Sequence, residues 1–501
     1  MKPNPERAGI SLRDVLTSAR FVQTSDVRVT ACCTSPEEVS PGDLFIAVTA
    51  ADSDGHEWAD EAVRRGASAV LAERLLPVSG PQVVVDDSRE ALGEICQALV
   101  GRPSDSLRTI GVTGTSGKTV TSLLIASVLE AAGQTVGVTS SVGYSDSVDQ
   151  SAAKLTTPHA PLLAKWLSRM TEAGCTSAVL ELSSRALAER RAAGVDFDAA
   201  VLTNLREAHL SFHGSQENYR RAKERLLSML KPGGFAVLNA DDEASAELLT
   251  RLDAPVLTFG LQTEADVTGE IIERQRSEQT FLLSAGNETV PVRTRMIGDH
   301  HVANCLAAAA VGLTLGIDAT TIARGLEAVE RVPGRLERLE CGQSFGVFVD
   351  SARTPEQLAC TLRTLRKNTA GRLICVFGAP GGRNRGIRAE LGRVAERSCD
   401  LPIITSNDPR HEEPLKIAHD ILDGFHRPAK GHVLPGRVEA IRYALLTAQP
   451  GDCVVITGKG DREEQIVGKR RLMHDDRAIA RAWLYRQGGE ELRRPKFRVV
   501  G

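Results

Sequence analysis

The segment TIGVTGTSGKTVTSLL (109–124) constrains the fold more than any other part of the sequence. A strand-like apolar run leads into GTSGKT (114–119), and a helical pattern follows. Glycines at such a turn let backbone N–H groups wrap phosphates, and the helix N-terminus adds a positive dipole. The motif is the short GxxGKT type, because the first glycine of the longer pattern is Val112 here. It predicts a bound nucleoside triphosphate; an ordinary strand–helix turn is the alternative.

Two residues of this loop and one further carboxylate have predictable chemistry. Lys118 would reach the terminal phosphates, and the Thr119 hydroxyl would bind Mg²⁺. Glu181 follows a buried-looking strand, where a carboxylate suits a Mg²⁺ site; a helix cap or a surface carboxylate is the alternative. His209 follows the next strand and Lys223 lies on a helix, and the residue pattern alone assigns neither a role.

Apolar strands alternate with helical patterns along most of the chain, which predicts an α/β protein with parallel sheets covered by helices. A chain of 501 residues is too long for one ordinary core. The segments GRPSDS (101–106) and RVPGRLERL (331–339) are typical of connections between domains. We therefore predict three domains, over residues 1–107, 108–333 and 334–501.

The composition excludes several classes of partner. A net charge of −3 gives no reason to expect nucleic acid or an acidic membrane surface. The first residues lack the apolar core of a signal peptide, and no run approaches the length of a membrane helix. The ten cysteines are scattered without a CxxC pair, so neither a zinc site nor a disulfide framework is expected. A reduced, cytoplasmic location is expected.

Eight short motifs occur in a fixed order between residues 114 and 460, and together they resemble the Mur ligase family. The resemblance extends from about residue 39 to residue 481. They are GTSGKT, LTTP (155–158), ELSSRAL (181–187), TNLREAHLSFHGSQENYRRAK (203–223), LNADD (238–242), VPGRLER (332–338), SNDPRHEEP (406–414) and GKG (458–460).

This resemblance implies that a carboxylate accepts the phosphate of ATP. The D-glutamate carboxylate of UDP-MurNAc-L-Ala-D-Glu would become an acyl phosphate, and the amine of a diamino acid would displace phosphate to form an amide. A carboxylate is a poor electrophile until one oxygen becomes a leaving group, and Mg²⁺ with Lys118 would neutralise the charge of the transfer. The implied enzyme is a monomer whose three domains bind the UDP-sugar, ATP and the amino acid in chain order.

The resemblance also implies roles for individual residues. His209 would lie near the metal, and Lys223 would be carried as a carbamate (N6-carboxylysine), an acid-like group that can ligate Mg²⁺. The implied catalytic residues are Lys118, Glu181, His209 and Lys223, and the implied metal ligands are Thr119, Glu181, His209 and carbamylated Lys223. The implied ATP-binding residues are Gly114, Thr115, Ser116, Gly117, Lys118, Thr119, Asn239, Asp242, Arg335 and Asp350. Thr156, Thr157, Ser183 and Arg191 would hold the muramoyl-dipeptide, and Arg383, Asp408, Arg410, Gly458 and Arg462 would line the amino-acid pocket.

Several positions depart from the family pattern. They are Ala208 for an aspartate, Arg185 for a histidine, Ser351-Ala352-Arg353 for Tyr-Ala-His, His300-His301 for Phe-Asn, Ile387 for a lysine, and Ser35-Pro36-Glu37 near the expected uridine site. No uridine contacts are therefore assigned in residues 1–107.

Two positions bear on the choice of amino acid. Arg410 suits bidentate capture of a distal carboxylate, which diaminopimelate has and lysine lacks. Arg462 replaces a glutamate that pairs with the distal ammonium in the family, and it would repel that ammonium unless Glu463 takes over. We predict meso-2,6-diaminopimelate as the substrate, with L-lysine as the alternative.

Other functions remain open on the sequence. The departures motivate a catalytically impaired paralogue that binds the nucleotide precursor or partners the true ligase. A general P-loop ATPase or kinase leaves LTTP and SNDPRHEEP unexplained. A sister ligase that adds glutamate to folate or builds another peptide would lack the arginine at position 410. The retained phosphate loop, Glu181, His209 and Lys223 favour an active ligase.

Overall fold

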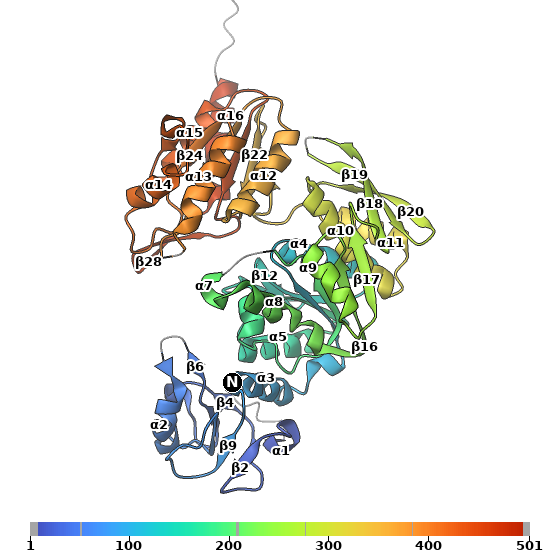
Figure 1. Cartoon of the computed structure of the whole chain (residues 1–501), viewed down its shortest axis with the longest axis vertical. Coiled ribbons are helices and arrows are strands. Elements are labelled where there is room, and N and C mark those ends of the chain that lie inside the picture. The colour runs from blue at the N-terminus through green and yellow to red at the C-terminus, as the bar shows by residue number, and fades with distance from the viewer. Residues whose placement is uncertain (1–8, 51–52, 207–209, 276, 383, 494–501) are drawn as a thin grey trace, which may run out of the picture. The chain divides into compact units, whose positions relative to one another are not determined.

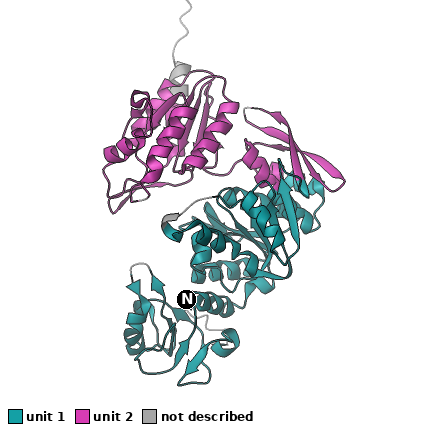
Figure 2. Cartoon of the chain, in the orientation of Figure 1, with its two compact units in different colours: residues 1–267, 307–325 teal, residues 268–306, 326–501 magenta. Residues whose placement is uncertain are grey.

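The computed structural model describes residues 9–50, 53–206, 210–275, 277–382 and 384–493. Figure 1 shows the elements in chain order. They form two compact units, one of residues 1–267 with 307–325 and one of residues 268–306 with 326–501 (Figure 2).

The first unit begins with a five-stranded sheet in the order β2-β9-β8-β5-β4. Its strands are β2 (Arg20–Val22), β4 (Cys32–Cys33), β5 (Leu44–Ile46), β8 (Ala69–Ala72) and β9 (Gln82–Val84), and all neighbours except the antiparallel pair β2–β9 are parallel. Helix α3 (Ser88–Leu99) begins at Asp87, whose carboxylate accepts the N–H groups of the first turn. The same helix buries Ile95 and Cys96 in the core of this sheet.

Small elements complete this N-terminal region. They are β1 (Ile10–Ser11), α1 (Leu12–Val15), β3 (Arg28–Val29), β6 (Thr49–Ala50), β7 (Ser53–Asp54) and α2 (Ala59–Arg64).

A larger parallel sheet follows in the order β11-β14-β10-β15-β16-β17, with β12 and β13 added antiparallel beyond β11. Its strands are β10 (Arg108–Thr113), β11 (Val136–Ser140), β12 (Gly143–Ser145), β13 (Gln150–Ser151), β14 (Ser177–Glu181), β15 (Phe197–Leu202), β16 (Leu230–Asn239) and β17 (Val256–Gly260). Strands β11 and β14 are buried at every residue, as expected where helices cover both faces of a parallel sheet.

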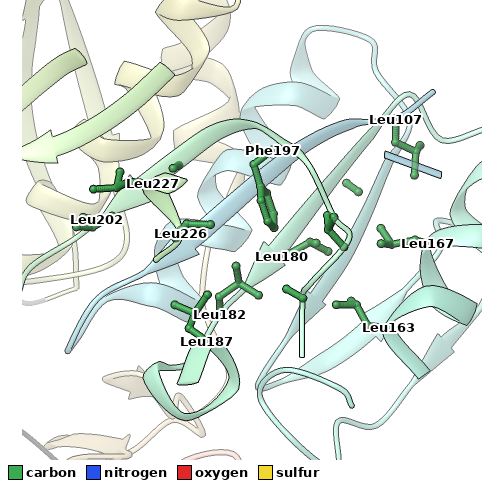
Figure 3. Packing of buried hydrophobic residues seen from close by; sticks show 14 of the residues in the cluster. Leu107, Leu163, Leu167, Leu180, Leu182, Leu187, Phe197, Leu202, Leu226 and Leu227 are labelled. Atoms are coloured by element: carbon green, nitrogen blue, oxygen red, sulfur yellow. The ribbon is translucent and has the colours of Figure 1, made fainter. Parts of the chain in front are cut away.

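The helices that accompany this sheet and the next elements are α4 (Lys118–Ala131), α5 (Ala160–Glu172), α6 (Ser184–Ala188), α7 (Leu210–His213), α8 (Gln216–Glu224), α9 (Glu243–Ala246), α10 (Asp299–Thr314) and α11 (Ala319–Ala328). Leu163 and Leu167 lie four residues apart on α5 and pack with Leu180 and Phe197 of the sheet in one buried cluster (Figure 3). Each such buried side chain contributes about 1.5–3 kcal/mol of transfer free energy.

The second unit contains β18 (Val267–Arg274), β19 (Gln279–Ala285) and β20 (Glu288–Thr294), in that order, and a separate six-stranded sheet. The separate sheet has the order β21-β22-β26-β23-β24-β25 and is parallel except at β21. Its strands are β21 (Glu337–Arg338), β22 (Gly346–Asp350), β23 (Leu373–Phe377), β24 (Leu401–Ile404), β25 (His432–Val433) and β26 (Cys453–Thr457).

Helices cover both faces of this sheet, so its core is divided into two clusters. One cluster includes Leu358 of α12, Leu391 of α13 and Ile421 of α14, and the other includes Ile441 of α15 and Leu484 of α16. The helices are α12 (Pro355–Lys367), α13 (Gly386–Ser398), α14 (Pro414–Leu422), α15 (Arg437–Thr447) and α16 (Asp476–Arg493), and a hairpin of β27 (Glu464–Val467) and β28 (Arg470–Met473) precedes α16.

The predicted α/β class is confirmed. None of the helices in the described part of the chain is long and apolar enough to cross a membrane.

Candidate functional site

The candidate site lies where the order of the parallel strands reverses. Strand β10 lies between β14 and β15, and Val112 of β10 is in register with Glu181 of β14. Ligands of open α/β sheets bind outside the carboxyl ends of the strands at such a reversal. The loop 114–119, the end of β14 and the residues that follow β15 therefore lie at one edge of the sheet.

The phosphate-binding loop has the backbone that its glycines predict. Gly114 has φ +150° and Gly117 has φ +86°, and residues with a Cβ atom rarely adopt such backbone angles. The Thr115 N–H donates to the carbonyl of Asn204 at 2.9 Å, and the Ser116 N–H donates to the Asn204 side-chain oxygen at 3.0 Å. Asn204 thus shapes the loop from the end of β15, a role that the sequence analysis did not assign.

Gly114 provides a test of this conformation. A Cβ atom at Gly114 would lie 1.8 Å from Thr203 Oγ1, whereas one at Gly133 (φ +81°) would meet nothing within 4 Å. We expect Gly114→Ala to weaken ATP binding by about tenfold or more and to lower Tm more than Gly133→Ala, which carries only a backbone cost of about 1 kcal/mol. Calorimetric titration with ATP and thermal unfolding would measure both. Equal effects of the two substitutions would contradict the expected contact.

The two polar side chains at the start of α4 face different partners. Lys118 Nζ donates to the carbonyls of Gly114 at 2.9 Å and Thr115 at 3.2 Å, so its ammonium lies over the loop. Thr119 Oγ1 donates to Glu181 Oε1 at 3.1 Å. The loop and the end of β14 are therefore in direct contact.

Glu181 is a buried carboxylate held by neutral donors. The residue is only 2% exposed, and its Oε2 accepts a hydrogen bond from the Ser141 N–H at 2.8 Å. Both a helix cap and a surface carboxylate are excluded, because Glu181 ends strand β14 and is buried. An oxygen ligand of this kind, beside a threonine hydroxyl, suits a hard divalent cation.

Lys223 lies in the same site although it is 100 residues or more from the loop in sequence. It is 1% exposed, its Nζ donates to the Gly114 carbonyl at 2.6 Å, and it lies 4.9 Å from the centre of the Tyr219 ring. Burial lowers the pKa of Lys223 well below its usual value, and the charge of Lys118 adds to this effect while Glu181 opposes it. The environment therefore favours the neutral, nucleophilic amine.

Asn239 and Asp242 support the neighbouring strand ends. Asn239 Nδ2 donates to the Thr203 carbonyl at 2.8 Å, and the Asp242 carboxylate accepts the Leu205 N–H at 3.0 Å while capping α9. Both residues contact backbone groups that follow β15, and their contact with ATP stays a prediction.

Three of the residues predicted to hold the dipeptide form a continuous network at the end of β14. Thr157 Oγ1 donates to the Glu181 carbonyl at 2.8 Å and accepts the Ser183 N–H at 3.1 Å. Arg191 Nη1 donates to the Thr157 carbonyl at 2.8 Å. Thr156 is partly buried beside them in sequence. The network is therefore joined to the backbone of Glu181 at the end of β14.

Among the described residues, Arg185 is linked to this network only through Glu189, whose carboxylate also pairs with Arg191 at 2.6 Å. It forms an ion pair with Glu189 at 2.8 Å and lies 5.0 Å from the centre of the Phe212 ring, with a side chain 60% exposed. This departure is therefore a surface substitution in the structure.

His209 and Arg383 lie outside the described residues, as does Ala208. The roles predicted for His209 and Arg383 stay predictions.

In the second unit, Asp350 and Arg335 have protein partners. The Asp350 carboxylate accepts the Leu336 and Ala352 N–H groups at 2.8 and 2.9 Å. Arg335 Nη1 lies 3.3 Å from Asp461 Oδ1. Their contact with ATP is not tested by these interactions.

Asp408 and Arg410 follow strand β24 in left-handed backbone conformations, with φ +50° and +55°. Asp408 accepts a hydrogen bond from the buried Lys459 at 2.8 Å and lies 3.6 Å from Arg462. Arg410 Nε is buried and has no hydrogen-bond partner in the described structure. The loop predicted to line the amino-acid pocket therefore holds two cations on one carboxylate, with Arg410 two residues further along the chain.

Further cations surround this loop. Arg353 Nε donates to the Gly458 carbonyl at 2.9 Å. Burial lowers the pKa of Arg353 to about 9, with additional repulsion from Arg462 and Arg335. Gly458 has a φ of +102°, which favours glycine, and a Cβ atom at this position would lie 2.4 Å from the Asn407 side chain.

The Glu463 carboxylate has a protein partner, and its pairing with a substrate ammonium stays a prediction. It lies 3.4 Å from Arg477, and its side chain is 62% exposed. Arg462 instead pairs with Asp408, which screens part of its charge.

Comparisons with known proteins agree with this geometry. Residues 112–312 match the Mur ligase middle domain, and residues 334–460 match the Mur ligase, glutamate ligase domain. A relative from Geobacillus thermodenitrificans, named UDP-N-acetylmuramoyl-L-alanyl-D-glutamate--2,6-diaminopimelate ligase, is 40% identical over 451 residues, which cover 89% of this chain and 92% of the relative. The chain belongs to the Mur ligase family. A relative of the same name from Syntrophomonas wolfei is 37% identical, with 91% of this chain and 94% of the relative covered.

Solved Mur ligase structures extend this agreement to the fold. A structure of UDP-N-acetylmuramoyl-L-alanyl-D-glutamate--2,6-diaminopimelate ligase has a TM-score of 0.68 and 29% identity, and the match covers 96% of this chain and 99% of that one. Folylpolyglutamate synthase from Mycobacterium tuberculosis shares the fold at a TM-score of 0.61, with 19% identity over 74% of this chain. As a Mur ligase, the chain is an ATP-dependent ligase by family.

Proposed function

We propose that this Mur ligase joins meso-2,6-diaminopimelate to the D-glutamate carboxylate of UDP-MurNAc-L-Ala-D-Glu, a step of peptidoglycan precursor synthesis. The observation that carries the proposal is the meeting of Lys118, Thr119, Glu181 and Lys223 at one sheet edge. The names of relatives at 36–40% identity over about nine-tenths of the chain support the substrate. We assign UDP-sugar binding to residues 1–107, ATP binding to 108–333 and amino-acid binding to 334–501 of a monomer.

The residues of the site fit Mg²⁺ and a carbamate. The described residues contain no group of three or more His, Cys, Asp and Glu side chains that could hold a metal, so the fit depends on ligands of other kinds as well. Thr119 and Glu181 offer oxygen ligands, and Lys223 would offer two more as a carbamate. Mg²⁺ bound there would neutralise phosphate charge.

The chain's own groups would then position and stabilise the transfer. The loop N–H groups and Lys118 would hold the terminal phosphate, and the Thr157–Ser183–Arg191 network would hold the dipeptide beside it. The carboxylate oxygen attacks phosphorus and ADP departs. The amine nitrogen then attacks the acyl carbon, loses a proton and expels phosphate.

The charges of the C-terminal loops favour diaminopimelate over L-lysine. Lys459 and Arg462 share one carboxylate, Asp408, and Arg410 adds a further positive charge two residues along the same loop, so the loops carry excess positive charge. A substrate with two carboxylates gains more from this field than one with a single carboxylate. The unpartnered Arg410 Nε is available for the distal carboxylate.

Phosphate release by the purified chain tests this function. The protein would be mixed with ATP, Mg²⁺ and UDP-MurNAc-L-Ala-D-Glu, with meso-diaminopimelate, L-lysine or no amine, and the product identified by mass. We expect release and a tripeptide product only with diaminopimelate. Precursor binding without release with either amine would replace the proposal by a non-catalytic binding protein.

Arg410→Lys tests the assignment of the distal carboxylate. The substitution keeps the charge but loses the bidentate fork, so we expect KM for diaminopimelate to rise about 30-fold, the equivalent of about 2 kcal/mol. KM for ATP should not change. Arg471→Lys, on the exposed side of the neighbouring hairpin, is the matched control and should leave both constants unchanged. An unchanged KM for diaminopimelate in Arg410→Lys would exclude this role.

A further inference from the structure

A small cavity in the second unit holds a thiol beside an imidazole. The cavity has a volume of about 90 Å³ and is lined by the end of β18, the start of α10 and one face of α12. Cys360, Arg363 and Lys367 follow one another at helical spacing along that face of α12. His300 of α10 and Arg274 of β18 complete the lining around them.

Cys360 is one of two partly exposed cysteines, and it lies beside an imidazole. Of the ten cysteines, all in the described residues, eight are buried, and only Cys341 and Cys360 are partly exposed. The Sγ atom of Cys360 lies 3.6 Å from Nδ1 of His300. A thiol that can pass its proton to an adjacent imidazole is a better nucleophile than an isolated thiol.

The groups that face His300 favour its protonated form. Burial alone would lower the pKa of His300, but the hydrogen bond and charge of Cys360, with the charges of Asp350 and Asp299, raise its pKa above the usual value. His301, whose ring centre lies 4.2 Å away, has a pKa far below the usual value because of burial and remains neutral. An imidazolium at His300 stabilises a thiolate at Cys360.

The cavity also carries excess positive charge. Arg274, Arg363 and Lys367 line it, against the single carboxylate of Asp299. Asp299 already forms ion pairs with Arg274 and, at 3.3 Å, with Lys367. Anionic reagents are therefore drawn to the thiol, whereas cationic ones are repelled. A volume of about 90 Å³ is below the roughly 300–1,000 Å³ of drug-sized ligand sites, so the cavity suits a small group.

We propose that Cys360 is a modification site that forms a mixed disulfide with small anionic disulfides. The Cys360 thiolate attacks one sulfur of the reagent, the S–S bond breaks, and a new S–S bond forms to Cys360. The departing sulfur leaves with the electron pair as a thiolate, and the proton held by His300 passes to this thiolate or, when the departing thiol is acidic, to water. Cys360 is oxidised and half of the reagent is reduced, so no other oxidant is needed. The proposal is independent of the ligase function.

Reaction of the full-length protein with dithiobis-nitrobenzoate, an anionic aromatic disulfide, tests the site. Release of the coloured thiolate gives the rate, and peptide mass mapping gives the position. We expect Cys360 to react at least about tenfold faster than Cys341. Cys360→Ser should remove the fast phase, and Cys341→Ser should leave it. Equal rates at the two cysteines would overturn the proposal.

Two further variants separate the imidazole from the charge. His300→Asn should slow the fast phase by about tenfold near neutral pH and move its rise toward the pH of an ordinary thiol. Arg363→Gln should slow reaction with dithiobis-nitrobenzoate but not with cystamine, a cationic disulfide, whereas Arg393→Gln on the exposed side of α13 should change neither. An unchanged rate and pH profile in folded His300→Asn would exclude the thiol–imidazole pair. Equal slowing of both reagents by Arg363→Gln would exclude the preference for anions.

Discussion

Lys118→Ala is expected to lower kcat by about 1,000-fold, the loss found when one preorganised group that stabilises transition-state charge is removed. The ammonium of Lys118 lies over the loop within 2.9 Å of the Gly114 carbonyl, where it would meet the terminal phosphates of ATP. Phosphate release under saturating substrates measures the effect. Lys118→Arg should recover little activity, because a guanidinium does not fit the place of a compact ammonium.

Lys165→Ala is the control for Lys118. Lys165 lies on the exposed side of α5, and its removal should change kcat by less than about twofold. A Lys118→Ala protein that keeps its Tm and most of its kcat would show that the loop is an ordinary strand–helix turn.

Lys223→Met is expected to lower kcat by about 100- to 1,000-fold while the protein stays folded. Lys223 is 1% exposed and burial holds its pKa well below the usual value, so a larger fraction of its amine is in the neutral form, which is the form that takes up CO₂. The neutral fraction of Lys223 grows as pH rises through its folded-state pKa, which lies below that of an exposed lysine. Methionine has a similar shape and no charge, so Tm should not fall by more than about 3 °C.

Isotope-labelled bicarbonate tests the carbamate directly. We expect a carbamate signal by NMR in the unmodified chain and none in Lys223→Met, and removal of CO₂ should lower activity reversibly. Lys231 is a matched lysine, because its ammonium is ion-paired with Asp198 at 2.8 Å, and Lys231→Met should keep the signal. A signal that persists in Lys223→Met, or activity that is insensitive to CO₂, would contradict carbamylation.

Some properties of the site follow from the sequence alone because they depend on neighbouring residues. The glycines of the loop, Lys118 and Thr119 are contiguous, and a strand–turn–helix pattern fixes where their backbone and side chains point. The alternation of apolar strands with amphipathic helices likewise determines the α/β class, since period and polarity are local properties. Both predictions are confirmed by β10, α4 and the parallel sheets.

Other properties were decided only by the tertiary structure, because they depend on burial and on contacts between distant residues. A lysine on an amphipathic helix is usually solvated, and only the packing of α8 against the loop removes Lys223 from water and lowers its pKa. Tertiary packing likewise decides the contacts of Asn204 with the loop, of Arg462 with Asp408 and of Cys360 with His300. The sequence by itself determined the fold class and the phosphate-binding loop, whereas the environment of each ionisable side chain was determined by which strand ends and helix faces the fold brings together.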